Sequence, residues 1–218
     1  MAKQTDVTYE TLTYPRQIRL DTVGGLCNAS CPSCHRFLTK RQGEMDSDLL
    51  DRLLKDIATW PPEAKLNTIG RGGLTREIVP VNYGEFFLRQ DWFEILTKIY
   101  QRLSYMQLVI PTNGSLLNDE AVAKLCSIPT VRVINFSINA YFEETYQSFM
   151  GLNPSNMARI EKAIKQIKIL RPDITRWASM VFDPEYQTDY ERDMFIGYWK
   201  DVVHQVQILP AASAGRGK

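Results

Sequence analysis

Residues 27–34 read Cys27-Asn28-Ala29-Ser30-Cys31-Pro32-Ser33-Cys34 and hold three of the four cysteines in the chain. Thiols at this spacing can reach three corners of one small metal centre. Soft thiolate ligands select iron–sulfur clusters, zinc or copper(I). A [4Fe–4S] cube held by three cysteines leaves one iron without a protein ligand, and an open metal position is typical of a catalytic site. The stretch therefore predicts a cluster bound by Cys27, Cys31 and Cys34.

A zinc site is the alternative for these cysteines, and it would need a fourth ligand. His35 is adjacent to Cys34 and would strain a tetrahedral site, while His204 or Cys126 would have to fold close. The spacing favours the cluster over zinc. The remaining thiol, Cys126, lies on the same helical stretch as Val122 and Leu125, which favours a buried structural role.

Composition places the chain among ordinary globular proteins and excludes several classes. It has 218 residues, of which 44% are hydrophobic and 23% charged, enough for one sizeable core. The 26 basic and 25 acidic side chains give a net charge of +1, without the basic excess of a nucleic-acid binder. No run of 18 apolar residues and no apolar signal core occur, so we expect a cytoplasmic protein without a membrane partner.

Apolar runs alternate with amphipathic segments on both sides of the cysteine stretch. We expect strands at 17–23, 78–82, 106–110, 131–138, 176–182 and 206–209, and a glycine-rich loop or hairpin at 67–77. Helices are expected at 47–59, 92–103, after an Asn118 cap, at 156–170, and from a Thr188–Glu191 capping box through 202. This alternation predicts an α/β fold with a parallel sheet and outer helices, and leaves open whether the sheet is doubly wound or a barrel.

Small and polar residues stand where several of these strands end, which is where parallel sheets place their active sites. Glu85 offers an anion for an ammonium group, and Gly84 lets backbone approach a ligand. Ser137 and Asn139 stand two apart and would face the same side of a strand. Taken alone, these residues also fit a helix-start anion, a turn and a solvated strand end.

The Cx3Cx2C pattern after a first strand resembles the signature of radical S-adenosylmethionine (SAM) enzymes, and the resemblance extends from about residue 17 to residue 215. Four further segments carry it. Tyr83-Gly84-Glu85 resembles the motif that holds the methionine amine of the cofactor. Thr112-Asn113-Gly114 resembles a turn of the peptide-modifying and cofactor-building branches. Residues 136–140 resemble a Ser-x-Asp segment whose Ser, here Ser137, contacts the cofactor, and Leu209 stands where the family packs an apolar residue on adenine.

The resemblance implies a partial (β/α)6 TIM-like barrel over residues 17–218, preceded by a segment at 1–16, and leaves open a truncation before a C-terminal extension. It implies a [4Fe–4S] cluster and SAM as cofactors, with an external reductant of the flavodoxin or ferredoxin type. SAM would be cleaved reductively to a 5′-deoxyadenosyl radical that abstracts hydrogen from a substrate, preferably a peptide or protein. The alternatives are a small-molecule or cofactor-biosynthesis enzyme and a non-catalytic iron–sulfur or zinc module.

Three positions depart from the family pattern. Ser33 stands where an aromatic residue often precedes the third cysteine, and Asn139 replaces the usual Asp. Met150 precedes Gly151 where many relatives carry an arginine for the cofactor carboxylate. That carboxylate then needs another partner, for which Arg71, Arg176 and Asn139 are the alternatives.

Overall fold

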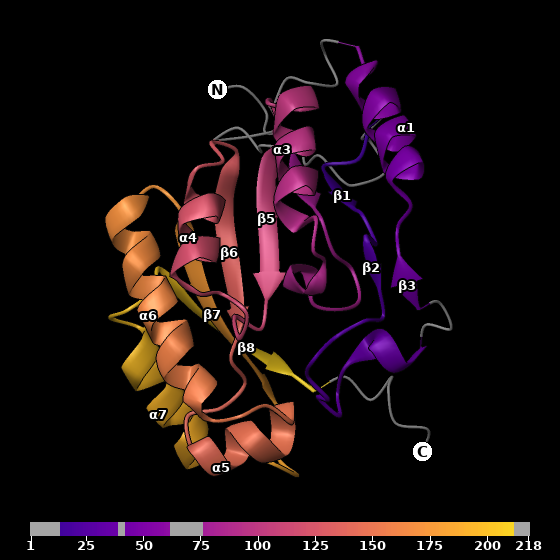
Figure 1. Ribbon diagram of the computed structural model, residues 1–218. Coiled ribbons are helices and arrows are strands. Elements are labelled where there is room, and N and C mark those ends of the chain that lie inside the picture. The colour runs from indigo at the N-terminus through magenta and orange to yellow at the C-terminus, as the bar shows by residue number, and fades with distance from the viewer. Residues whose placement is uncertain (1–13, 39–41, 62–75, 212–218) are drawn as a thin grey trace, which may run out of the picture.

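The computed structural model describes residues 14–38, 42–61 and 76–211 (Figure 1). Six parallel strands form the main sheet in the order β1-β4-β5-β6-β7-β8, which is also their order along the chain. Their bounds are Gln17–Arg19 (β1), Glu77–Val79 (β4), Gln107–Thr112 (β5), Val131–Ser137 (β6), Thr175–Phe182 (β7) and Gln205–Pro210 (β8). A doubly wound sheet reverses its strand order, and this one does not. The sheet is therefore of the barrel type, and it is partial because β1 and β8 pair with one strand each and not with one another.

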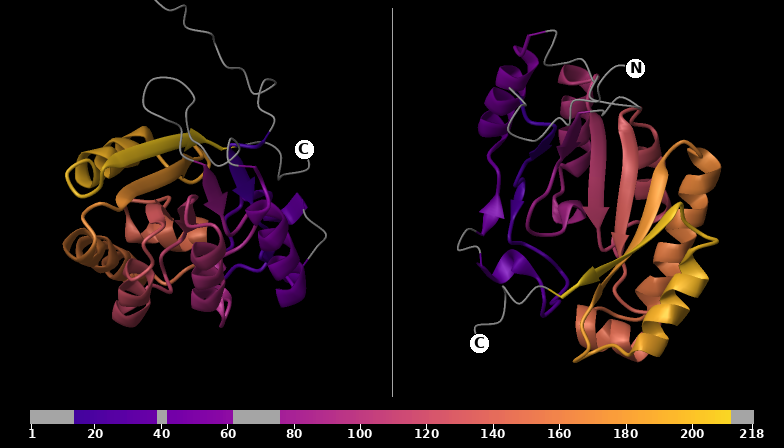
Figure 2. Two further views of the ribbon diagram at one scale, coloured as in Figure 1. Left: turned by 90° about the horizontal axis from the view of Figure 1, so that it is seen from above. Right: turned by 180° about the vertical axis from the view of Figure 1, so that it is seen from behind.

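Five main helices connect and cover these strands. They are α1 (Ser47–Ala58), α3 (Trp92–Arg102), α4 (Asp119–Cys126), α6 (Ser155–Leu170) and α7 (Asp189–Trp199). Figure 2 shows them on the outer side of the curved sheet. Side-chain caps at Asp46 and Asn118 start α1 and α4, and the sequence predicts the cap at Asn118. Each helix buries one apolar stripe, for example Ile160, Ile164 and Ile167 of α6.

The first expected strand, 17–23, is divided in the structure. β1 ends at Arg19, and Val23–Gly24 (β2) instead pairs antiparallel with Gly43–Glu44 (β3) in a second, two-stranded sheet. The second expected strand is shorter at its end than predicted, because Pro80 has no N–H to continue the ladder after Val79. Of the expected loop at 67–77, residues 67–75 lie outside the described residues.

The capping box expected at Thr188 and Glu191 is half formed. The Thr188 hydroxyl accepts from the Glu191 amide, as predicted. The Glu191 carboxylate, however, accepts from the backbone amides of Tyr141 and Phe142 and from the Thr145 hydroxyl. A tertiary contact therefore replaces the local one, and buried Glu191 fixes the connection that leads from β6 into α5 (Glu143–Thr145).

The apolar core lies between the sheet and the helices, with β5 and β6 at its centre. Leu108 and Ile110 of β5 alternate with less buried neighbours, as a half-covered strand requires. All six strands run in the same direction, so their carboxyl ends meet at one edge of the sheet, the lower edge in Figure 1. Within the described ranges, no helix has both the length and the apolar character that crossing a membrane requires.

Candidate functional site

The cysteine loop, residues 25–34, lies at the carboxyl edge of the sheet between β2 and the short helix η2 (His35–Leu38). Three backbone hydrogen bonds of 2.8 Å hold it there. The Gly25 amide donates to the Tyr83 carbonyl, the Glu85 amide donates to the Leu26 carbonyl, and the Ser30 amide donates to the Met150 carbonyl. The loop is thereby supported from two sides, by the segment after β4 and by the segment after β6.

Two glycines make this support possible. Gly84 has a φ of +131°, and a Cβ there would lie 2.4 Å from the Leu26 carbonyl oxygen and 2.6 Å from that of Val23. At Gly151, with a φ of +65°, a Cβ would lie 2.0 Å from the Ser30 hydroxyl oxygen. The sequence assigns to Gly84 the close approach of a ligand. In the structure, the backbone that approaches Gly84 is that of the cysteine loop itself.

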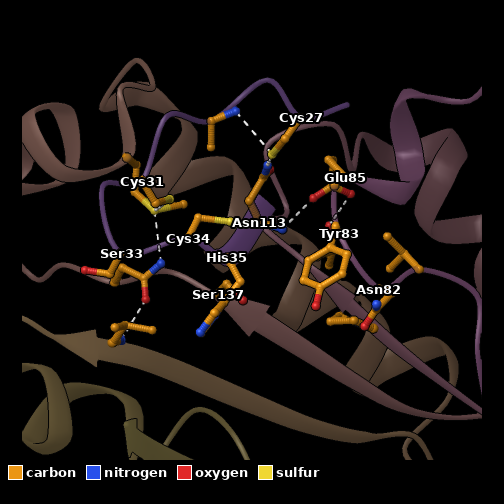
Figure 3. A pocket seen from close by; sticks show the side chains of 18 of the residues that line it. Cys27, Cys31, Ser33, Cys34, His35, Asn82, Tyr83, Glu85, Asn113 and Ser137 are labelled. Carbon is orange, nitrogen blue, oxygen red and sulfur yellow. Dashed lines mark hydrogen bonds between the residues drawn. The ribbon is translucent and has the colours of Figure 1, made fainter. Parts of the chain in front are cut away.

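A cavity of about 510 Å³ opens beside the loop. It brings together most of the side chains singled out in the sequence, from four separate parts of the chain (Figure 3). The predicted site residues that line it are Cys27, Cys31, Cys34, Gly84, Glu85, Asn113, Ser137 and Asn139. Leu209 is not among the described lining residues. It is 45% exposed on β8, beside Val181 of β7, which does line the cavity.

The three thiols have surroundings suited to thiolate ligands. Backbone amides donate to two of them, Ala29 N to Cys27 Sγ at 3.4 Å and Arg36 N to Cys34 Sγ at 3.5 Å. Burial and the neighbouring thiols raise the pKa of Cys31 to about 12, and burial also raises the pKa of Cys27. A metal removes this cost because a coordinated thiol is deprotonated outright. The donor set therefore fits an iron–sulfur cluster.

Of the fourth ligands considered for zinc, only His35 lines the cavity beside the three thiols in the described part of the chain. His204 and Cys126 both lie near the amino ends of the strands, at the opposite edge of the sheet. His204 accepts a hydrogen bond from the Arg176 amide at the start of β7, and Cys126 ends α4 before β6 begins. No three His, Cys, Asp or Glu side chains in the described ranges converge around one ion. A cube of four irons spreads its ligands more widely than a single zinc ion does.

Glu85 is buried at the first turn of η3 (Phe86–Leu88) and faces the same cavity. Its carboxylate accepts hydrogen bonds from the Thr112 hydroxyl at 2.8 Å, the Asn113 amide at 2.7 Å and the Phe87 amide at 3.2 Å. Burial raises the pKa of Glu85, and these three donors oppose the rise. The carboxylate has no ion-pair partner among the described residues, so a bound cation would find a preformed, oriented acceptor.

Asn113 belongs to a small amide network under the loop. Its Nδ2 donates to Asn28 Oδ1 at 2.8 Å, and Asn28 Nδ2 donates to the Ser115 hydroxyl at 2.8 Å. The Ser115 hydroxyl donates in turn to Asn113 Oδ1 at 2.6 Å. Asn113 thus ties the carboxyl end of β5 to the cysteine loop, and its Nδ2 also lies 4.0 Å from Cys27 Sγ.

Ser137 and Asn139 both line the cavity, although not for the reason given by the sequence. β6 ends at Ser137, and Asn139 lies beyond it with a φ of 61°, so strand alternation does not relate the two. The Asn139 amide bonds within the protein, with Oδ1 accepting from Val181 N at 2.8 Å and Nδ2 donating to Met150 Sδ at 3.1 Å. No hydrogen bond of the Ser137 hydroxyl is found within the described residues.

The three departures from the family pattern belong to one network. Met150 is buried and its Sδ lies 3.2 Å from Cys31 Sγ as well as beside Asn139. The Ser33 hydroxyl donates to Asp183 Oδ2 at 2.9 Å, which joins the loop to the end of β7. Gln187 then connects the Asp183 amide, at 2.6 Å, to the Asn139 carbonyl, at 2.5 Å. Ser33, Asn139 and Met150 therefore stabilise the loop together.

Of the two arginines considered for a carboxylate, the structure describes only Arg176, which lies elsewhere. Arg71 lies outside the described residues. Arg176 stands at the amino end of β7, where it donates to the Ile174 carbonyl at 2.8 Å, so it cannot reach the cavity. Arg19, at the end of β1, does line the cavity. Sequence reasoning missed Arg19 because a strand expected through residue 23 placed it in mid-strand, whereas β1 ends there.

Solved structures with the same fold include several that bind S-adenosylmethionine (AdoMet). Streptococcus suis SuiB bound to precursor peptide SuiA has a TM-score of 0.67 at 13% identity, over 92% of this chain and 40% of SuiB. The enzyme anSMEcpe with bound AdoMet has a TM-score of 0.67 at 16% identity, over 90% of this chain and 51% of its own. BtrN in complex with AdoMet and 2-DOIA has a TM-score of 0.52 at 15% identity, over 75% and 56%.

This chain thus spans about 40% to 56% of the length of these structures. Among curated proteins, a sequence search finds no match. At these low sequence identities, the solved structures show the fold alone, and membership of a family is shown by a family model. The model of the radical SAM superfamily matches residues 22–194, which include the cysteine loop, Glu85, Asn113 and Ser137. The chain therefore belongs to the radical SAM superfamily, whose enzymes use S-adenosylmethionine and a [4Fe–4S] cluster.

Proposed function

We propose that this chain binds a [4Fe–4S] cluster through Cys27, Cys31 and Cys34, binds SAM in the adjoining cavity, and acts as a radical SAM enzyme. The observation that carries the proposal is that the three thiols, Glu85 and Ser137 line one cavity at the carboxyl edge of the sheet. When bound, the cluster supplies the electron for reductive cleavage of SAM to methionine and a 5′-deoxyadenosyl radical, which takes hydrogen from the substrate.

We assign a separate role in SAM binding to each of these residues of the cavity. Glu85 accepts the ammonium group, because its buried carboxylate is held by three donors and lacks an ion-pair partner in the described chain. Arg19 lines the same cavity, and its Nε donates to Gln17 Oε1 at 2.8 Å. We assign to its guanidinium the role of holding a carboxylate, in the place of the arginine that Met150 replaces. Ser137 offers its hydroxyl to the cofactor. Asn113 and Asn139 keep the loop and the strand ends in position.

We further propose a peptide or protein substrate. Two of the structures with this fold hold peptides, SuiB with precursor peptide SuiA and anSMEcpe with the Cp18Cys peptide. An external one-electron donor, a flavodoxin or ferredoxin, would approach the exposed side of the loop, where Asn28 and Ser30 are exposed.

The first experiment reconstitutes the protein anaerobically with iron and sulfide, adds dithionite and SAM, and measures 5′-deoxyadenosine by mass spectrometry. Wild type is compared with Cys31→Ala. We expect wild type to bind iron and release 5′-deoxyadenosine, and the variant to do neither. A protein that retains zinc and takes up no iron would contradict the proposal and support a zinc module. A protein that binds iron and never cleaves SAM would support a non-catalytic iron–sulfur module.

A small-molecule substrate is the second candidate, favoured by the fold that the chain shares with BtrN in complex with 2-DOIA. The two classes are separated by deuterium transfer. The reconstituted enzyme is incubated with a uniformly deuterated peptide digest or with a deuterated small-metabolite fraction, and 5′-deoxyadenosine is analysed for deuterium. Deuterium from the digest supports the peptide class, and deuterium from the metabolite fraction alone overturns it.

A further inference from the structure

The turn that follows β7, residues 183–187, contains two buried polar side chains that the proposed function leaves unused. Asp183 and Gln187 are each 3% exposed. The turn is closed by its own groups, since Asp183 Oδ1 accepts from the Glu185 amide at 3.1 Å and the Gln187 amide donates to the Asp183 carbonyl at 2.9 Å. Neither Asp183 nor Gln187 is among the described residues that line the cavity. Buried polar side chains cost free energy unless they are hydrogen-bonded, so their partners show what the turn holds in place.

The first partner of the turn lies in the cysteine loop. Asp183 Oδ2 accepts a hydrogen bond from the Ser33 hydroxyl at 2.9 Å, although 150 positions separate the two residues. A carboxylate is a stronger acceptor than a neutral oxygen. Ser33 lines the cavity and directly precedes Cys34 (Figure 3). The bond therefore fixes the end of the loop that carries the third thiol.

The second partner lies just beyond β6. Gln187 Nε2 donates to the Asn139 carbonyl at 2.5 Å, while Gln187 Oε1 accepts from the Asp183 amide at 2.6 Å. Asn139 has a φ of 61°, a conformation that is uncommon outside glycine and persists where the surroundings hold it. Its own Oδ1 accepts from the Val181 amide at 2.8 Å. Gln187 and the end of β7 therefore hold Asn139 in this conformation.

One turn thus connects two walls of the cavity. Ser33 comes from the cysteine loop and Asn139 from the segment after β6, and both line the cavity. The other supports of the loop do not involve the turn, because the amides of Gly25, Glu85 and Ser30 make the backbone bonds that hold the loop elsewhere. Loss of the contacts of the turn should therefore leave most of the cysteine loop in place.

We propose that Asp183 and Gln187 are positioning residues for SAM: acting through Ser33 and Asn139, they set the separation of the two cavity walls that SAM must contact. The proposal rests on the proposed function, which assigns the cavity to SAM. It makes a specific prediction, because the backbone bonds that hold the rest of the loop remain. Breaking either contact should weaken SAM binding and leave the uptake of iron unchanged.

The first measurement uses metal-free protein and two variants at one position. Threonine and valine have nearly the same shape, and only threonine keeps a hydroxyl. In Ser33→Val we expect hydrogen–deuterium exchange to become roughly threefold faster or more in peptides that cover residues 25–34 and 183–187, as expected for one lost hydrogen bond. Ser33→Thr should exchange like wild type. Wild-type exchange in Ser33→Val, or equal changes in both variants, would overturn the proposal, since the hydroxyl would not hold the turn.

The second measurement uses protein loaded with the cluster at equal iron content, and equilibrium dialysis of labelled SAM. Ser33→Val and Gln187→Met should each weaken SAM binding by roughly 3- to 10-fold, the range expected for a lost hydrogen bond. Methionine keeps the length of the glutamine side chain and removes its amide. Ser33→Thr should bind SAM like wild type. So should Gln107→Met, the matched control, because Gln107 begins β5 at the opposite edge of the sheet.

The outcomes separate this inference from the proposed function. If wild type takes up no iron or binds no SAM, the proposed function fails and the inference falls with it. If wild type binds SAM, and Ser33→Val and Gln187→Met bind it as tightly, only the inference is wrong. Variants that fold normally and yet lose iron would also overturn it, because the turn would then support the cluster and not SAM.

Discussion

The two edges of the main sheet carry similar types of residue in different roles. At the amino edge, charged side chains are bonded to the chain itself. Arg171 donates to the Cys126 and Ile128 carbonyls, and Arg176 donates to the Ile174 carbonyl. At the carboxyl edge, three thiols and the Glu85 carboxylate face a cavity instead. Glu85 is also hydrogen-bonded within the chain, but it faces the cavity and has no ion-pair partner among the described residues. The comparison teaches that ionisable groups facing a cavity mark function, whereas arginines bonded only within the chain mark stability.

The strongest test of this difference between the two edges removes one cysteine from each edge. Cys34→Ala should lose the cluster and all release of 5′-deoxyadenosine, because two thiolates do not hold a [4Fe–4S] cube. Cys126→Ala should keep both and lose about 1 kcal/mol of stability, as a small buried side chain is truncated. Iron content and 5′-deoxyadenosine are measured for the two variants side by side. Loss of the cluster in Cys126→Ala would make the distinction between the edges untenable.

A substitution of Gly84, which supports the cysteine loop, is expected to have the next largest effect, a loss of stability. In Gly84→Ala the added Cβ would lie 2.4 Å from the Leu26 carbonyl oxygen, at a φ that side chains rarely adopt, so we expect a loss of ~2–4 kcal/mol. Gly197→Ala is the matched control. Gly197 lies within α7 with no atom within 4 Å of its added Cβ, and alanine should stabilise the helix by ~0.5–1 kcal/mol. Urea unfolding of the metal-free proteins measures both, and similar changes in the two would refute the loop contact.

A substitution of Glu85 tests whether the cavity binds SAM. Glu85→Gln keeps the shape of the side chain and removes its charge, so the affinity for SAM should fall by ~10- to 100-fold, as expected for a charge-assisted hydrogen bond. Glu77→Gln changes a carboxylate at the amino end of β4, where it bonds Gln17, and should leave the affinity unchanged. Equilibrium dialysis of labelled SAM against cluster-loaded protein compares them. An affinity in Glu85→Gln within twofold of wild type would remove Glu85 from the proposed SAM site.

The sequence predicts which segments meet at the carboxyl edge of the sheet better than it predicts the positions of single residues there. The strand and helix order follows from local periodicity. The predicted residues that line the cavity all lie in segments that follow strands, except Ser137, which ends β6. Arg19 was missed because alternation over residues 17–23 continues while the pairing partner changes from β4 to β3. The contact of Met150 with Cys31 gave no signal in the sequence, because the two residues are 119 positions apart. Contacts at such separation are decided by the fold and not by any local pattern.

The smallest effect belongs to the amino edge and depends on pH. The Arg171 guanidinium, which donates to both oxygens of Asp173, lowers the pKa of that carboxyl to about 2. A lowered pKa in the folded state adds stability above the unfolded pKa, and this stability disappears as the pH falls from about 4 toward about 2. Because Asp173 is 44% exposed, Asp173→Asn should lose less than ~1 kcal/mol at pH 7. Urea unfolding of metal-free wild type and variant at pH 7 and pH 3 measures this. A difference between them that stays constant or grows toward acid would show that Asp173 acts through its shape and not through its charge.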